Sequence, residues 1–124
     1  MANVLVVDDE VEMRTLLRRL LTKDGHEVWE AADGTEALRL LETSPFDLVI
    51  SDAYMANVDG MELLVRIQQR GVPTPVLMIS GGGYMARGDV LEMGKSCGAA
   101  ATLEKPFTAE QLRRTIEVLL QPRP

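Results

Sequence analysis

Five side chains with the chemistry to handle an anion occur at the ends of short apolar runs in this sequence. They are Asp8, Asp9, Asp52, Ser80 and Lys105. Three carboxylates packed together repel one another unless one is protonated or a cation lies among them. A few carboxylates completed by water and a phosphate oxygen are typical of a Mg²⁺ site. If these groups converge, Asp52 could attack a phosphoryl group as a nucleophile, with Lys105 and the metal stabilising its oxygens and Ser80 donating a hydrogen bond.

The elements that must bring these residues together alternate between buried strands and amphipathic helices. Short apolar runs bounded by turn residues predict five strands, near residues 4–7, 27–31, 46–52, 76–79 and 99–103. Apolar residues at helical spacing predict five helices, within residues 13–23, 37–44, 60–70, 86–97 and 109–120. Strands that alternate with helices require a parallel sheet with right-handed crossovers. We therefore expect a single α/β domain of the flavodoxin-like, doubly wound class, with strand order 2-1-3-4-5.

This strand order explains why the five side chains should meet. In open α/β sheets, reactive groups collect at the carboxyl ends of the strands, at the point where the strand order reverses. The first and third strands are neighbours there, so their aspartates converge, and the long stem of Lys105 can reach them from the fifth strand. In the first helix, the spacing also predicts a buried face opposite a face that carries Arg14, Arg18 and Arg19. The buried face is made by Met13, Leu16, Leu17, Leu20 and Leu21.

Length and composition limit the classes of function. The chain has 124 residues, which suits one domain, expected at residues 1–121, with 122–124 as a C-terminal tail or linker stub. A net charge of −6 argues against direct nucleic-acid binding, which needs a basic face. The apolar run near the N-terminus is too short for a signal sequence or membrane span. The single cysteine, Cys97, cannot form an internal disulfide, so we expect a cytoplasmic protein.

One motif suggests a different ligand. Residues 81–86 fit the dinucleotide-binding pattern G-x-G-x-x-A between a strand and a helix. Only one strand follows this motif, whereas a mononucleotide-binding half needs more. We therefore interpret the three glycines, Gly81 to Gly83, as a flexible loop that joins the fourth strand to the fourth helix.

Taken together, the residues resemble a known family, the receiver domain of two-component response regulators. The matching segments run over nearly the whole chain, through Val7-Asp8-Asp9-Glu10, residues 32–38, Asp52-Ala53-Tyr54-Met55 with Asp59-Gly60, Ile79-Ser80 and Lys105-Pro106-Phe107. The resemblance implies that Asp52 accepts a phosphoryl group from a histidine kinase or a phosphotransfer protein. It implies a Mg²⁺ ion held by Asp8 or Asp9, by Asp52 and by the backbone carbonyl of Tyr54. It also implies that Ser80 and Lys105 sense the phosphoryl group and that the Lys105-Pro106 peptide is cis.

The resemblance further implies a signalling domain that assists its own phosphorylation and dephosphorylation, and not a conventional enzyme. Its output surface would be the fourth helix, fifth strand and fifth helix, which would bind a downstream protein or a second copy of the domain. Two positions depart from the family pattern. Ala56 stands where many receivers have proline, and Thr102 stands where an aromatic residue usually works with the switch serine.

Two other functions are compatible with parts of this pattern. A pseudo-receiver would bind proteins without phosphorylation, but the acidic residues and Lys105 argue against it. A phosphatase of the dehalogenase type also forms an aspartyl phosphate. It would carry its nucleophile after the first strand in an aspartate-x-aspartate pattern, whereas this chain has the adjacent pair Asp8-Asp9.

Overall fold

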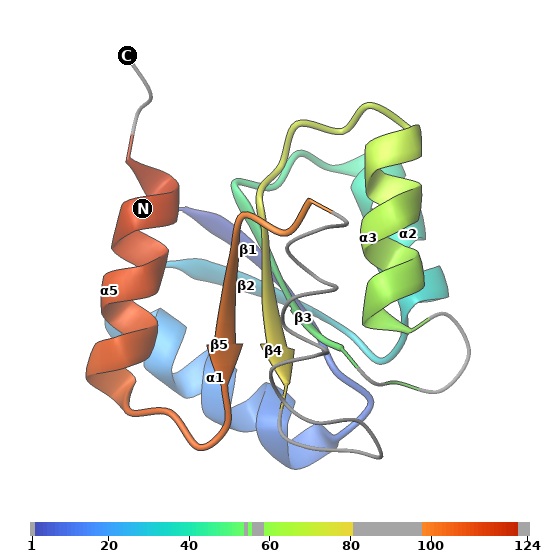
Figure 1. Cartoon of the computed structure of the whole chain (residues 1–124). Helices are drawn as coiled ribbons and strands as arrows, with labels where there is room; N and C mark the ends of the chain where they lie inside the picture. The colour runs from blue at the N-terminus through green and yellow to red at the C-terminus, as the bar shows by residue number, and fades with distance from the viewer. Residues whose placement is uncertain (1, 54, 56–58, 81–97, 122–124) are drawn as a thin grey trace.

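Five parallel strands form a single sheet in the computed structural model, which describes residues 2–53, 55, 59–80 and 98–121. The strands are β1 (Asn3–Val7), β2 (Glu27–Ala31), β3 (Leu48–Asp52), β4 (Val76–Ser80) and β5 (Ala101–Glu104). Their order is β2-β1-β3-β4-β5, and every neighbouring pair is parallel (Figure 1). All five carboxyl ends therefore lie at the same edge of the sheet.

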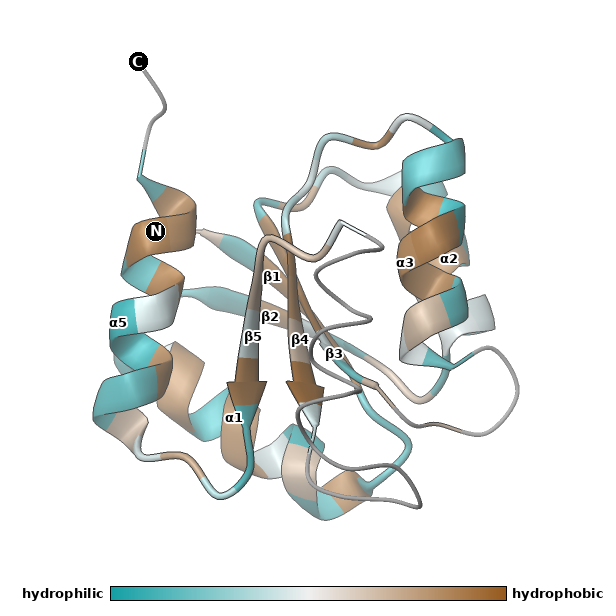
Figure 2. Cartoon of the chain, in the orientation of Figure 1, coloured by the Kyte–Doolittle hydropathy of each residue, from teal (hydrophilic) through white to brown (hydrophobic). Residues whose placement is uncertain are grey.

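Helices cover both faces of this sheet. They are α1 (Val11–Lys23), α2 (Gly34–Thr43), α3 (Gly60–Gln69) and α5 (Ala109–Leu120). The helices α1 and α5 pack on one face through Leu17, Leu21, Leu112 and Ile116, and α2 and α3 cover the other (Figure 1). Each helix carries hydrophobic residues toward the sheet and hydrophilic residues toward solvent (Figure 2). Burial of these two apolar layers is the main stabilising term for the fold.

Three helices begin at side-chain caps that the sequence encodes locally. Asp33 and Asp59 each accept a hydrogen bond from the backbone N–H three residues later, at 2.9 Å. Thr108 does the same for α5, and Gln111 bonds back to the Thr108 backbone to complete a capping box. Such caps satisfy backbone donors that have no partner inside the helix. They fix where α2, α3 and α5 leave the loops at the carboxyl edge of the sheet.

The observed fold confirms the predicted class and strand order. The last strand begins at Ala101, two residues later than expected, and the helix expected over 86–97 lies outside the described residues. The prediction that Leu16 is buried was wrong, because its exposed fraction is 44%. The contact with the sheet is narrower than the apolar stripe of α1, and only Leu17 and Leu21 reach full burial.

Candidate functional site

The acidic side chains gather where β1 and β3 end. Val7 pairs with Ser51 in the sheet register. Asp8 and Asp52 are the next residues after this pair, so both lie at the carboxyl edge of the sheet. Both are buried, with exposed fractions of 2% for Asp8 and 6% for Asp52. One carboxylate oxygen from each of Asp8, Asp9, Glu10 and Asp52 lies within 4.8 Å of the others. The structure therefore brings together the three aspartates predicted from the sequence and adds a fourth acid, Glu10, which that prediction had not included.

Lys105 reaches this cluster from the end of β5. Its Nζ lies 3.2 Å from Asp52 Oδ2 and 4.0 Å from Asp8 Oδ2. The Lys105 backbone N–H donates to the Ser80 carbonyl at 2.8 Å, which ties the ends of β5 and β4 together. The Lys105-Pro106 peptide is cis, as the resemblance implied. One ammonium group therefore faces two buried carboxylates, with Ser80 on the adjacent strand.

Arg14 holds the acidic loop in place, a role that sequence patterning assigned to no residue. Its guanidinium donates through Nη1 to the Asp8 backbone carbonyl at 2.7 Å and through Nε to Glu30 Oε1 at 3.2 Å. The Arg14 side chain is only 16% exposed, whereas helical periodicity placed it on the solvent face. A guanidinium can bridge two acceptors in a fixed planar geometry. Arg14 thus joins α1, β2 and the end of β1 beside the carboxylates.

Burial sets the protonation of Asp8. Removal from water raises the pKa of its carboxyl from 3.8 to about 6, and the nearby charges of Asp52 and Glu10 add to this increase. The Glu10 backbone N–H, which donates to Asp8 Oδ1 at 2.9 Å, and the Lys105 ammonium act in the opposite direction. Desolvation and repulsion outweigh these two contacts. An ionised Asp8 is therefore held at a cost that a bound cation would relieve.

The donors at this edge suit a hard divalent cation. All four clustered groups are carboxylates, and Mg²⁺ is bound in proteins through one or two carboxylates, retained water and phosphate oxygens. Asp9 and Glu10 are exposed, which leaves an open side for water and for an incoming anion. Tyr54, whose backbone carbonyl was expected to be a ligand, lies outside the described residues. The acidic residues that are described fit a Mg²⁺ ion.

Two buried serines near Asp52 differ in their hydrogen bonds. Ser51 Oγ donates to the Asp52 backbone carbonyl at 3.0 Å. Ser80 is equally buried, yet within the described part of the chain its Oγ has no hydrogen-bond partner. A buried hydroxyl without a partner loses its hydration and gains nothing in return. A ligand oxygen at this edge of the sheet could therefore accept a hydrogen bond from Ser80 Oγ.

This contrast predicts opposite effects of two Ser→Ala substitutions on stability. Ser51→Ala should lower the free energy of unfolding by about 1 kcal/mol, because it removes a hydrogen bond. Ser80→Ala should leave it unchanged or raise it by up to about 1 kcal/mol, because it removes an unsatisfied hydroxyl. Urea titrations of both variants beside the wild type measure the difference. An equal loss in the two variants would contradict the assignment of Ser80 as unpaired.

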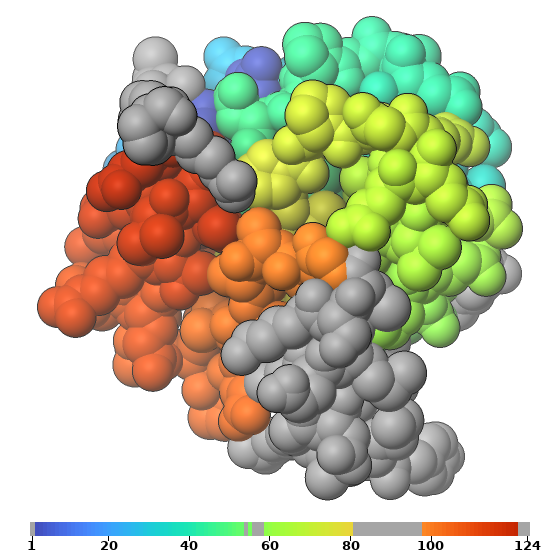
Figure 3. All heavy atoms as spheres, turned by 45° about the horizontal axis from the view of Figure 1, so that its top comes forward, coloured from blue at the N-terminus to red at the C-terminus, as the bar shows by residue number. Residues whose placement is uncertain are grey.

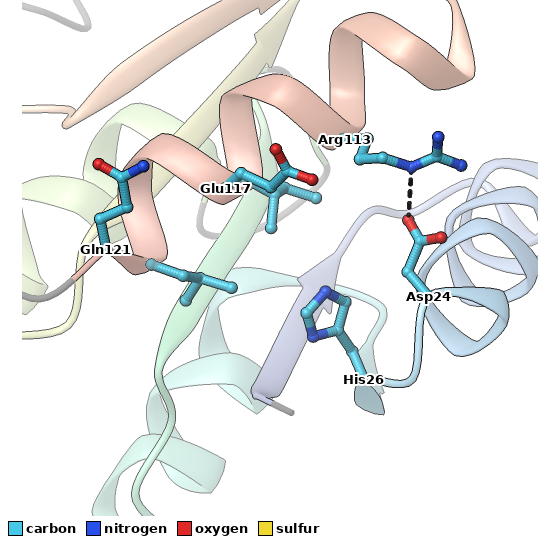
Figure 4. A pocket seen from close by; sticks show the side chains of 7 residues that line it. Asp24, His26, Arg113, Glu117 and Gln121 are labelled. Atoms are coloured by element: carbon cyan, nitrogen blue, oxygen red, sulfur yellow. Dashed lines mark hydrogen bonds and ion pairs between the residues drawn. The ribbon is translucent and has the colours of Figure 1, made fainter.

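Two hollows of the described surface lie elsewhere. One of about 600 Å³ lies between α5 and the turn before β2, next to the ion pair between Arg113 and Asp24 (Figure 4). His26 lines it, and its Nδ1 accepts a hydrogen bond from the Ala2 backbone N–H at 3.3 Å. Another of about 520 Å³ lies near the start of β5, between α5 and α3 (Figure 3). Both are at the amino edge of the sheet, opposite the carboxylates.

Comparison with known proteins finds relatives that match nearly the whole chain. A family model for the response regulator receiver domain matches residues 4–117. The transcriptional regulatory protein TcrA of Mycobacterium tuberculosis is 37% identical over 94% of this chain and 45% of its own length. The alkaline phosphatase synthesis transcriptional regulatory protein PhoP of Bacillus subtilis is 32% identical over 95% of this chain and 48% of its own length. The chain therefore spans less than half the length of these two relatives.

Solved structures of receiver domains are also similar to this chain. The receiver domain of NtrX from Brucella abortus superposes with a TM-score of 0.87 at 35% identity, covering 94% of this chain and 97% of that one. The Francisella response regulator 1452 receiver domain gives a TM-score of 0.88 at 28% identity, with 97% of both chains covered. None of the helices in the described ranges has the length and hydropathy of a membrane span. By its fold, its carboxylate cluster and these matches, the chain belongs to the response regulator receiver domain family of two-component signalling systems.

Proposed function

We propose that this domain accepts a phosphoryl group on Asp52 from a histidine kinase or a phosphotransfer protein, in a Mg²⁺-dependent reaction. The observation that carries the proposal is the buried Asp52 carboxylate, paired with Lys105 at 3.2 Å inside a cluster of acids. Asp52 is confined at a strand end, where a phosphoryl donor can approach past the exposed Asp9 and Glu10. A buried carboxylate with a fixed cation beside it is poised for nucleophilic attack on phosphorus.

In the proposed reaction, a carboxylate oxygen of Asp52 forms a bond to phosphorus. The bond from phosphorus to the histidine nitrogen of the donor breaks, and its electron pair stays on that nitrogen. Lys105 stabilises the phosphoryl oxygens as charge moves onto them. The Ser80 hydroxyl donates a hydrogen bond to one of these oxygens, which would satisfy a group that lacks a partner in the described residues.

Asp8, Asp9, Asp52 and the Tyr54 carbonyl would hold the Mg²⁺ ion. Bound there, the ion supplies positive charge that neutralises the carboxylates and the phosphoryl oxygens. Asp8 is the buried member of the pair, and Arg14 fixes its backbone through the carbonyl. Asp9 is the exposed member and can approach the ion from the solvent side. Asp8 would therefore bind the ion from the buried side of the site and Asp9 from the solvent side.

The proposed output is a change in a protein-binding surface. Lys105 and Ser80 connect the site to β5 and β4, and their backbones are joined by a hydrogen bond of 2.8 Å. A shift of Lys105 toward a phosphoryl group would therefore displace β5 and the start of α5. We propose that residues 1–121 act as the receiver and 122–124 as a tail or linker stub. The partner would be a downstream protein or a second copy, bound through the fourth helix, β5 and α5.

Intact mass spectrometry tests the proposed function. The wild type is incubated with acetyl phosphate, with and without MgCl₂, and is expected to gain one phosphoryl group only with the metal. Asp52→Asn should gain none. Asp59→Asn is the matched control, because it makes the same chemical change in the loop after β3 and asparagine still caps α3. It should be phosphorylated like the wild type.

Failure of the wild type to gain a phosphoryl group, even with a histidine kinase supplied, would contradict the proposal. That outcome would favour the alternative function, a pseudo-receiver that binds proteins without phosphorylation. Equal labelling of Asp52→Asn and the wild type would instead show that another residue accepts the group.

A further inference from the structure

Glu10 lies at the mouth of the carboxylate cluster but outside the set of residues to which metal binding has been assigned above. One of its carboxylate oxygens is within 4.8 Å of an oxygen from each of Asp8, Asp9 and Asp52. Its side chain is exposed, so it borders the site from the solvent side. The Glu10 backbone N–H is fixed by its hydrogen bond to Asp8 Oδ1 at 2.9 Å. The position of Glu10 is therefore set by the same acid that it faces.

Within the described residues, the Glu10 carboxylate makes no side-chain hydrogen bond or ion pair. Glu10 is the N-cap residue of α1, yet its side chain makes no capping hydrogen bond to the helix. Arg14, one turn later, directs its guanidinium to Glu30 and to the Asp8 carbonyl. The carboxylate thus faces three other acids, and its charge raises the pKa of Asp8. In the absence of a cation this arrangement is unfavourable.

The balance of charge indicates what such an acid does. Three ionised aspartates and Lys105 sum to a charge of about −2, which a divalent ion alone would neutralise. Glu10 leaves one further negative charge at the mouth. That charge attracts a divalent cation and repels a phosphate-bearing donor. Both effects act over the same short distance between the Glu10 carboxylate and the ligand. Glu10 should therefore have opposite effects on the two ligands.

We propose that Glu10 is a specificity-determining residue of this site: it increases the affinity for the divalent cation and slows reaction with small anionic phosphodonors. The inference rests on the proposed function, because it assumes that the cluster binds Mg²⁺ and that Asp52 accepts a phosphoryl group. Exposure of Glu10 means that its effect is electrostatic at the rim, and it weakens as ionic strength rises.

The experiment compares Glu10→Gln with Glu12→Gln at low, fixed ionic strength. Both variants lose one exposed negative charge at the start of α1, Glu10 at the N-cap and Glu12 in the first turn, but Glu12 lies outside the cluster. Isothermal titration calorimetry with MgCl₂ measures cation affinity without any phosphodonor. Glu10→Gln should weaken Mg²⁺ binding by about threefold to tenfold, whereas Glu12→Gln should change it by less than about twofold. Thermal melts check that all three proteins are folded.

The second measurement is the rate of phosphorylation by acetyl phosphate at saturating MgCl₂. There Glu10→Gln should react about twofold to fivefold faster than the wild type, and Glu12→Gln at the wild-type rate. Equal Mg²⁺ affinities in Glu10→Gln and the wild type would overturn the inference, as would equal effects of the two variants. If the wild type binds no Mg²⁺, the proposed function itself fails at its metal requirement. If it binds Mg²⁺ but Glu10→Gln binds equally well, only this inference fails.

Discussion

Replacing Asp8 by asparagine should stabilise the metal-free domain at neutral pH by about 2 kcal/mol. Asp8 is 2% exposed, and burial with its acidic neighbours raises its pKa from 3.8 to about 6. A shift of this size corresponds to about 3 kcal/mol of stability lost on ionisation. Asparagine avoids that cost and can still accept the hydrogen bond from the Glu10 N–H. The pKa of about 6 already includes the opposing attraction to Lys105, whose Nζ is 4.0 Å away, and the expected gain is smaller than the full figure because burying the asparagine amide has a cost of its own.

The pH dependence follows from the direction of the shift. Between about pH 4 and pH 6 the folded state keeps the Asp8 proton, whereas the unfolded chain has already released it. The contribution of Asp8 to stability therefore falls as the pH rises through this window and is constant above it. The advantage of Asp8→Asn should be absent near pH 4 and complete above about pH 7.

Urea titrations without metal at several pH values between 4 and 8 measure this effect. Glu12→Gln is the control, because it removes an exposed acid from the helix that follows Asp8 and should change stability little. A destabilised Asp8→Asn, or a gain of the same size at pH 4 and pH 7, would contradict the assigned cause. The same variant should bind Mg²⁺ more weakly, so it separates the stability of the site from its proposed function.

A second large effect is expected at Gly60, the first residue of α3. A Cβ atom there would collide with the Asp52 carbonyl oxygen and would lie 2.9 Å from Ala53 Cα. The Gly60 N–H also donates to the Ala53 carbonyl at 3.2 Å, so α3 begins directly against the end of β3. The obstacle is backbone on both sides, which cannot rotate away as a side chain can. Gly60→Ala should therefore cost about 3 kcal/mol or more and displace Asp52, which would also lower the phosphorylation rate.

Gly71→Ala provides the comparison for this prediction. Gly71 has a φ of +69°, but a Cβ at this position would meet no atom within 4 Å. Alanine there should cost only the strain of the left-handed conformation, about 1 kcal/mol, and leave phosphorylation unchanged. Urea titration and intact mass after acetyl phosphate treatment measure both quantities for both variants. A Gly60→Ala protein as stable and as reactive as Gly71→Ala would show that the contact with Asp52 is unimportant.

Much of the site could be predicted because its residues follow strands directly. A buried strand that ends on Asp52 or Ser80 fixes that side chain at the carboxyl edge, and parallel pairing brings the edges together. The cap at Asp59 is encoded just as locally, since the capping side chain and the backbone N–H that donates to it lie three residues apart. Short-range geometry of this kind is encoded in a single segment.

Contacts that depend on how elements cross were not predictable from the sequence. Arg14 has the periodicity of a solvent-facing residue, and only the angle of α1 over β1 and β2 brings it to Asp8 and Glu30. Leu16 has the periodicity of a core residue, and the same crossing leaves it exposed. The steric conflict at Gly60 and the absence of a described hydrogen-bond partner for the Ser80 hydroxyl likewise depend on other segments of the fold. Tertiary packing decides these positions, and no local pattern contains it.

The strand order places the two ends of the Asp52–Lys105 ion pair on strands that differ in how easily they open. β3 is bonded on both sides, to β1 and to β4, and all five of its residues are buried. Among the described strands, β5 is bonded to β4 alone, and its residues are at most half-buried. Central strands separate only when the whole domain unfolds, whereas edge strands open at lower free energy. The Asp52 carboxylate thus belongs to a central strand, whereas Lys105 directly follows an edge strand that opens at lower free energy.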